Sequence, residues 1–132
     1  MHGLWHIVLG LILGLLVGLG NIEILFFVLG GALIDIDHLL YMMIGERIFS
    51  VKGMIDFHKK NFETMTPHFY ALHFIEIIVL SCIVFYFVNW YLFLFALGML
   101  FHWVCDVLKY IWFYRDFKSW IKYYSLVFYF GK

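Results

Sequence analysis

The 132-residue sequence has few charged residues, 14% of the total, against about 25% in an average soluble protein. Hydrophobic residues make up 65% of it, which excludes an ordinary water-soluble domain and predicts a membrane protein. The formal net charge is zero, so nucleic acid is not an expected partner, because phosphate backbones require a basic face. Only two cysteines occur, Cys82 and Cys105, and they form no C-x-x-C pair, so neither a redox motif nor a disulfide framework is indicated.

Long apolar runs are abundant, and each is close to the roughly 20 residues that cross a bilayer as a helix. The candidate spans are residues 3–20, 24–44, 67–88 and 91–114. We therefore predict an all-α fold, in which residues 1–132 form a single membrane-embedded bundle of about four transmembrane helices. The first run has no preceding Lys or Arg and no small-residue cleavage site, so we expect it to be retained in the protein.

Two segments lie outside these spans. Residues 45–65 are more polar and predict a loop between two helical hairpins, and residues 115–132 form an aromatic tail that suits the membrane interface or a fifth short element. All nine Lys and Arg fall on the side that this loop shares with both termini. The positive-inside rule makes that side cytoplasmic, so we expect a multi-pass protein of the cell (inner) membrane, surrounded by bilayer lipid.

All seven histidines and every carboxylate except Glu23 lie on that cytoplasmic side, either in its loops or in the cytoplasmic half of a span. His6 shares a row of residues four apart with Gly10 and Gly14, and glycines at that spacing let membrane helices approach closely. We expect this row to face the bundle. His102 and Asp106 are also four apart, which places a nitrogen and an oxygen on one helix face where both can bind the same metal ion.

The run GALIDIDHLLY, residues 31–41, places three chemically active side chains inside an apolar segment. On a straight helix Asp35 and His38 share a face, whereas Asp37 points about 160° away from Asp35. Either the helix breaks near residues 34–38, or one of these aspartates is not a ligand. An ionised Asp costs on the order of 3 kcal/mol at mid-membrane, and divalent cations would offset that cost. The alternative is a charged turn that merely ends the span.

The third span has its own polar residues. Thr66 and Pro67 predict an N-cap and a first helical residue, which places His68 in the first turn. His73 and Glu76 then lie three residues apart on a neighbouring face, where Glu76 would support a ligand histidine and the role of His73 stays open.

These motifs together resemble the YdjM-like family of membrane-bound metal-dependent hydrolases. The resemblance is carried by GALIDIDHLLY, by His58-Lys59, by the TPH at residues 66–68 and by the HWVCD at residues 102–106. The family pattern is an N-terminal His, D-x-D-H, HR-x-x-TH and a later H-x-x-x-D over a multi-span helical domain, and Lys59 stands where it has Arg. That family is similar in motif order to all-α zinc phospholipases C and single-strand nucleases. The metal ligands that the resemblance implies are His6, Asp35, His38, His68, His102 and Asp106, and Asp37 and His58 complete the predicted set.

The leading hypothesis is a hydrolase that binds one to three Zn²⁺ and cleaves a phosphate ester of a lipid or lipid-linked substrate at the cytoplasmic face. Asp35 or Asp37 would link two metals or act as general base, and Lys59 and Lys60 would steer the substrate phosphate. The alternative is a membrane protein that binds or transports a transition metal, because intramembrane His and Asp also line ion paths. A haem-binding bundle and a purely structural membrane protein are the further alternatives.

Overall fold

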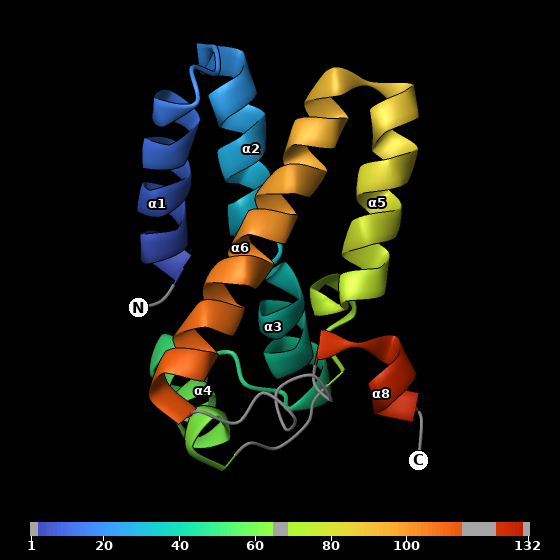
Figure 1. The fold of residues 1–132 in the computed structure, drawn as a ribbon. Helices are drawn as coiled ribbons and strands as arrows, with labels where there is room; N and C mark the ends of the chain where they lie inside the picture. The colour runs from blue at the N-terminus through green and yellow to red at the C-terminus, as the bar shows by residue number, and fades with distance from the viewer. Residues whose placement is uncertain (1–2, 65–68, 115–123, 131–132) are drawn as a thin grey trace.

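The computed structural model describes residues 3–64, 69–114 and 124–130, and this part of the chain is all-α. Two antiparallel hairpins form the bundle, and their turns lie at the same end of the molecule (Figure 1). The first hairpin pairs α1 (Gly3–Leu16) with α2 (Asn21–Leu33). The second pairs α5 (Ile75–Val88) with α6 (Trp90–Tyr114), which crosses α2 diagonally. The predicted all-α class is confirmed.

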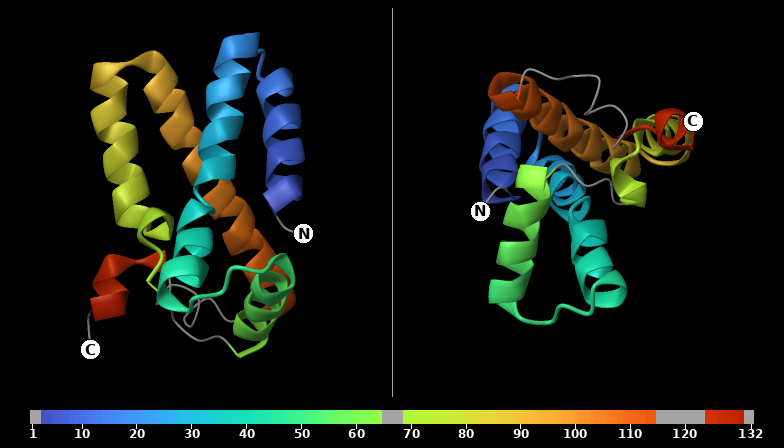
Figure 2. Two further views of the ribbon diagram at one scale, coloured as in Figure 1. Left: turned by 180° about the vertical axis from the view of Figure 1, so that it is seen from behind. Right: turned by 90° about the horizontal axis from the view of Figure 1, so that it is seen from below.

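Shorter elements lie at the end of the bundle away from the turns (Figure 2). After α2 the chain forms α3 (Ile36–Leu40) and then a π-helical turn, Tyr41–Gly45. Helix α4 (Val51–Thr64) and a 3₁₀ turn (Ala71–His73) follow, and α8 (Leu126–Phe130) lies near the C-terminus.

Helices form at all four predicted spans, but two of them are short. The helical stretches Asn21–Gly45 and Trp90–Trp112 are long and apolar enough to cross a membrane. By contrast, α1 and α5 have 14 residues each. At 1.5 Å per residue such a helix is roughly 21 Å long, which is short of the roughly 30 Å hydrocarbon core. The expectation of four full-length spans is therefore supported for two helices.

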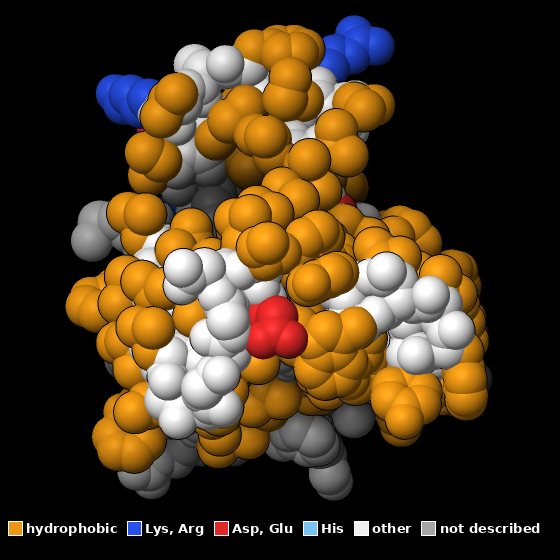
Figure 3. Space-filling model, turned by 90° about the horizontal axis from the view of Figure 1, so that it is seen from above, with side chains coloured by type: hydrophobic (Ala, Val, Ile, Leu, Met, Phe, Trp, Pro, Cys, Tyr) orange, Lys and Arg blue, Asp and Glu red, His pale blue; other side chains and the backbone are white. Residues whose placement is uncertain are grey.

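The outer surface of the bundle is hydrophobic. Large apolar side chains such as Leu16, Phe87 and Trp112 are about four-fifths exposed, at 78%, 80% and 81%. The face in Figure 3, seen from the end that carries the turns, is covered mostly by hydrophobic side chains around one acidic patch. Water-soluble proteins rarely expose so large an apolar surface.

Glycines allow α2 and α6 to cross at close range. A Cβ added to Gly30 would overlap the carbonyl oxygen of Phe95, and one added to Gly98 would overlap that of Phe27. Backbone therefore packs directly on backbone at this crossing. The crossing fixes the depth of His102, one turn beyond Gly98, relative to the end of α2.

The predicted glycine row on α1 also faces the bundle. Gly10 is buried against Phe27, Val28 and Phe101, and His6 is buried one turn earlier on the same row. The core next to the crossing contains Ile34, Ile78 and Met99.

The two turns are joined by Glu23, the charge predicted at that end of the bundle. One carboxylate oxygen accepts a hydrogen bond from the Gly20 amide at 2.7 Å, and the other accepts from the Trp90 indole at 2.6 Å. Asn89 caps α6 by accepting from the Tyr91 amide at 2.8 Å. This acidic residue therefore has structural partners in both hairpins.

Two predicted boundaries are wrong. Residues 45–65 are not simply a loop, because α4 begins at Val51, where the Ser50 hydroxyl caps the helix by accepting from the Gly53 amide at 3.1 Å. Helix α5 begins at Ile75 rather than at residue 67, and residues 65–68 lie outside the described part of the chain. Both cysteines are free and half-buried.

Glu76 does not support a ligand histidine as predicted. Its carboxylate instead accepts hydrogen bonds from the Ser125 hydroxyl, from the Leu126 amide at 3.0 Å and from the Val127 amide at 3.4 Å. The carboxylate therefore holds the start of α8 against the start of α5.

Candidate metal centre

The helix interruption predicted in GALIDIDHLLY is confirmed. Helix α2 ends at Leu33 and α3 begins at Ile36, with Ile34 and Asp35 forming the turn between them. At Asp35 the ψ angle is −4°, which departs from the helical value and rotates α3 relative to α2. The two aspartates, which a straight helix would separate, consequently approach the same histidine ring from its two sides.

One group of ligand atoms is formed by His6, His102 and Asp106, from α1 and α6. The Nε2 atom of His6 lies 3.3 Å from Oδ1 of Asp106, and the Nε2 atom of His102 lies 3.3 Å from Oδ2 of the same carboxylate. The two imidazole rings stack with centroids 3.9 Å apart. Both histidines are buried, and their ring nitrogens converge on one carboxylate.

A second group is formed by Asp35, His38 and His73. The Nε2 atoms of His73 and His38 lie 3.6 Å and 3.9 Å from Oδ1 of Asp35. His73 is completely buried, whereas Asp35 is the most exposed of the three. The side chains come from the turn before α3, from α3 itself and from the 3₁₀ turn before α5.

The two groups are adjacent, because Asp35 of the second group approaches His102 of the first. Its Oδ1 atom also lies 3.4 Å from Nε2 of His102. The arrangement is therefore one cluster of four imidazoles and two carboxylates, with Asp35 between its halves.

Hydrogen bonds behind the cluster set the tautomers of its two most buried histidines. The Nδ1 atom of His102 lies 2.6 Å from the carbonyl oxygen of Gly31, which can only accept, so Nδ1 carries the proton. Nδ1 of His73 lies 3.1 Å from Oδ1 of Asp37, and the same carboxylate accepts from the Leu72 amide at 2.9 Å. When neutral, both rings thus direct the lone pair of Nε2 at Asp35.

Lone pairs and carboxylate oxygens that face one another repel unless a cation lies between them. Nε2 of His73 is buried without a hydrogen-bond partner among the described residues, as is Nδ1 of His6. The cation is either a proton on each ring or a metal ion. A charge-assisted N–H···O bond is about 2.7–2.9 Å long, whereas the four shortest Nε2–carboxylate distances are 3.3, 3.3, 3.4 and 3.6 Å.

The distances of 3.3 and 3.4 Å match the spacing of metal ligands, whereas the second group is wider, at 3.6 and 3.9 Å. Ligand atoms about 2.0–2.1 Å from a tetrahedral Zn²⁺ are roughly 3.3 Å apart. Imidazole nitrogen and carboxylate oxygen are the donors that Zn²⁺ and similar divalent ions bind. The donor set and its spacing therefore fit a metal, and each of the two groups could hold one ion.

The structure brings most of the predicted ligands together. His6, Asp35, His38, His102 and Asp106 all lie in the cluster. Asp37 lies behind His73 and orients that ring, so it contacts a ligand histidine rather than the centre of the cluster. His68 lies outside the described residues, and His58 is on α4 with a side chain that the structure does not describe.

The residue that sequence reasoning did not place is His73. A helix starting at residue 67 would have put it on a neighbouring face, but Tyr70 and Phe74 are extended and the residues between them form a 3₁₀ turn. The ring therefore points into the cluster and not along a helix face. The sequence signal for this residue was a histidine next to an apolar helix. That signal does not predict the 3₁₀ turn that directs the His73 ring into the cluster.

Aromatic side chains surround the second group. The ring of Tyr70 lies 3.8 Å from that of His38, and the ring of Tyr124 lies 5.7 Å from that of His73. Burial raises the pKa of the Tyr124 phenol well above its ordinary value, and the Asp106 carboxylate adds to the rise. Tyr124 therefore stays neutral and keeps its proton at physiological pH.

The two predicted substrate-binding lysines, Lys59 and Lys60, are exposed on α4.

Comparison with known proteins adds no relative: the chain matches no family model, no curated protein and no solved structure. The resemblance carried by the motifs stays a prediction.

Proposed function

We propose that this protein is a membrane-bound, metal-dependent hydrolase that cleaves a phosphate ester of a lipid or lipid-linked substrate. The observation that carries the proposal is the single cluster in which Asp35 lies between two groups of ligand atoms at metal-ligand spacing. Paired metal sites with shared carboxylates suit phosphoester hydrolysis, because both the attacking and the leaving oxygen need charge stabilisation.

Each residue of the cluster has a place in the proposed centre. His6, His102 and Asp106 would hold one metal ion, and Asp35, His38 and His73 the other. When bound, divalent ions would lower the pKa of a bound water, and their positive charge would stabilise the phosphoryl oxygens. Asp37 keeps the proton of His73 on Nδ1, and the Gly31 carbonyl does the same for His102.

The most exposed carboxylate of the cluster marks where a substrate would approach. The Asp35 side chain is 37% exposed, against 2% for His102 and 0% for His73. Asp35 is therefore the group best placed to accept a proton from an attacking water, while the buried imidazoles behind it exclude bulk solvent.

The hydrophobic exterior and the two long apolar helices support a membrane location and a lipid-soluble substrate. The exposed lysines of α4 are suited to anionic headgroups at that surface. Zn²⁺ is the metal that best matches a donor set of imidazoles and carboxylates.

Metal transport is the second candidate, and one feature disfavours it. The described residues contain no further His and Asp group of this kind toward the turns, where the carboxylate of Glu23 is engaged by Gly20 and Trp90. A one-sided centre suits a reaction better than a path through the bundle.

Metal analysis combined with phosphoesterase assays tests the proposal. We expect purified protein to contain up to two Zn²⁺ per chain, and His102→Ala or Asp106→Ala to lose metal and hydrolysis of a lipid phosphate together. Asp56→Asn, which removes an exposed carboxylate on α4, is the matched control and should retain both. Metal-free wild-type protein that cannot be loaded with Zn²⁺, or metal flux into proteoliposomes without hydrolysis, would overturn the proposal.

A further inference from the structure

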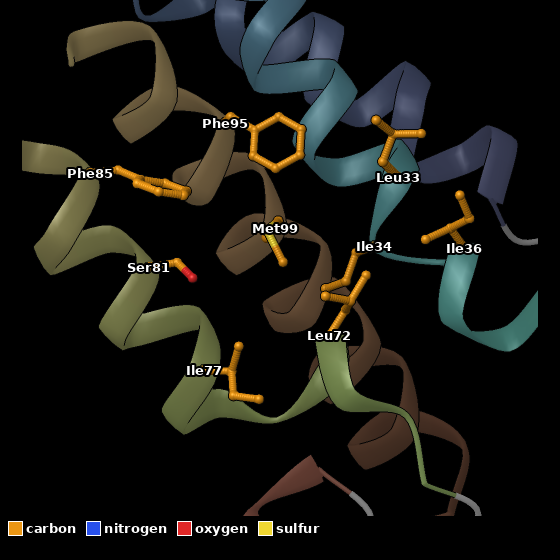
Figure 4. A pocket seen from close by; sticks show the side chains of 9 residues that line it. All are labelled: Leu33, Ile34, Ile36, Leu72, Ile77, Ser81, Phe85, Phe95 and Met99. Atoms are coloured by element: carbon orange, nitrogen blue, oxygen red, sulfur yellow. The ribbon is translucent and has the colours of Figure 1, made fainter. Parts of the chain in front are cut away.

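An apolar cavity of about 340 Å³ lies between the two hairpins. Its walls come from three parts of the chain: the junction of α2 and α3, the segment that runs from Leu72 through α5, and α6 (Figure 4). The lining residues are Leu33, Ile34, Ile36, Leu72, Ile77, Ser81, Phe85, Phe95 and Met99. None of them is charged, and the Ser81 hydroxyl is the one polar group among these side chains.

The wall of the cavity is continuous with the candidate metal centre. Ile34 and Ile36 flank Asp35 in the sequence, and Leu72 directly precedes His73. Leu72 is also fixed to the centre through its amide, which donates to the Asp37 carboxylate. The end of the cavity formed by Ile34, Ile36 and Leu72 is therefore the end nearest to the candidate metal centre (Figure 4).

We propose that this cavity binds the hydrocarbon chain of the phosphate ester and so places the phosphate at the metal centre. The inference rests on the proposed function and adds the substrate's chain as a determinant of specificity. A single alkyl or prenyl chain matches a lining without charge, and the phosphate at its end matches the cations that the cluster is suited to hold.

The size of the cavity suits a single hydrocarbon chain. A volume of 340 Å³ is at the lower end of small-molecule pockets, about 300–1,000 Å³. A protein partner is the competing occupant, and the labelling experiment below distinguishes the two.

A series of alkyl phosphates, from ethyl to octyl and below their micelle concentrations, tests the chain site in Zn²⁺-loaded protein. We expect kcat/KM to rise about threefold to fourfold per methylene, the factor for moving one CH₂ out of water. Ser81→Phe, which fills the cavity, should remove this rise while the metal content stays that of wild type. Phe85→Ala, which enlarges the cavity, should extend the rise to longer chains.

Leu80→Phe is the matched control, because Leu80 precedes Ser81 on α5 but is 60% exposed. It should keep the wild-type dependence on chain length. A rate of hydrolysis that does not change with chain length, or an equal rise in Ser81→Phe, would overturn the chain site and leave the proposed hydrolase intact.

A binding experiment separates the two proposals. Octyl phosphate that carries a photoreactive diazirine at the chain end should label cavity residues, and Ser81→Phe should reduce this labelling at least tenfold. Labelling of the cavity without any hydrolysis would support the chain site and refute the hydrolase. Labelling of the outer surface, unchanged in Ser81→Phe, or cross-linked dimers instead of a labelled cavity, would refute the chain site.

Discussion

Replacing Asp37 with asparagine separates the two roles that this residue could have, ligand and orienting group. Its Oδ2 atom accepts two hydrogen bonds, one from the Leu72 amide at 2.9 Å and one from Nδ1 of His73 at 3.2 Å, and its Oδ1 atom lies 3.1 Å from the same His73 nitrogen. Asparagine has the same shape but one accepting oxygen and one donating NH₂ group. Because both oxygen positions lie within 3.2 Å of Nδ1 of His73, the NH₂ group of Asp37→Asn faces that nitrogen in either orientation of the amide.

The cheapest relief is a change of tautomer in the His73 ring. If the new NH₂ group donates to Nδ1, the ring proton moves to Nε2, which is the atom that faces Asp35. A protonated Nε2 cannot bind a metal ion. Loss of such an orienting carboxylate typically lowers metal affinity 10–100-fold, which corresponds to about 1.4–2.7 kcal/mol.

Competition titration of Zn²⁺ against a chromophoric chelator measures this change in detergent-solubilised protein. We expect Asp37→Asn to weaken one of two sites by that factor, and Asp35→Asn to weaken both, because Asp35 lies between the groups. Asp56→Asn controls for the loss of a charge at an exposed position.

Two results would refute the reasoning about Asp37. If Asp37→Asn abolished binding at one site as completely as His73→Ala, the carboxylate would be a ligand itself. If it left both affinities unchanged, the contact with His73 would have no bearing on the metal.

Three further changes test the scaffold. Gly98→Ala should lower the free energy of unfolding by about 1–3 kcal/mol, because the new Cβ meets backbone at the α2–α6 crossing. Gly10→Ala is the control, because its Cβ meets only side chains at ordinary distance. Thermal unfolding in detergent compares the two variants. Glu76→Gln should weaken the docking of α8 by about 1 kcal/mol and speed proteolysis of the C-terminal segment. Equal proteolysis rates in the variant and the wild type would argue against a role of Glu76 in holding α8. Trp90→Phe removes the indole donor to Glu23 and should lower thermal stability without changing metal content; loss of metal would contradict the separation of the turns from the centre.

Hydrophobicity and helical phase predict much of the fold. Apolar runs locate all four bundle helices, and the row His6, Gly10 and Gly14 correctly gives the inward face of α1. Both signals work because they depend on local sequence and on a fixed angle per residue. Helix ends are less accurate, since they depend on caps. The start of α6 lies within one residue of its prediction, but the Thr66-Pro67 signal precedes the observed start of α5 by several residues.

The residues of the candidate metal centre can be predicted from the sequence where they lie on regular helices. His102 and Asp106 are four apart on α6, and their relation follows from the helix alone. His73 and Asp37 could not be placed in this way, because the position of each depends on backbone that departs from a helix. Their contact joins residues 36 positions apart, and no periodicity encodes it.

The turn at Ile34 and Asp35 gives both aspartates of the D-x-D-H run a contact with the same histidine. A continuous helix would direct one carboxylate inward and leave the other about 160° away, facing lipid or a neighbouring helix. The interrupted helix instead places Asp35 at Nε2 of His73 and Asp37 at Nδ1 of the same ring. One aspartate then belongs to the candidate metal centre, while the other orients a histidine of that centre. Two acidic residues in an apolar segment thereby contact a single imidazole. Mutation of either should lower the Zn²⁺ affinity of the site that contains His73.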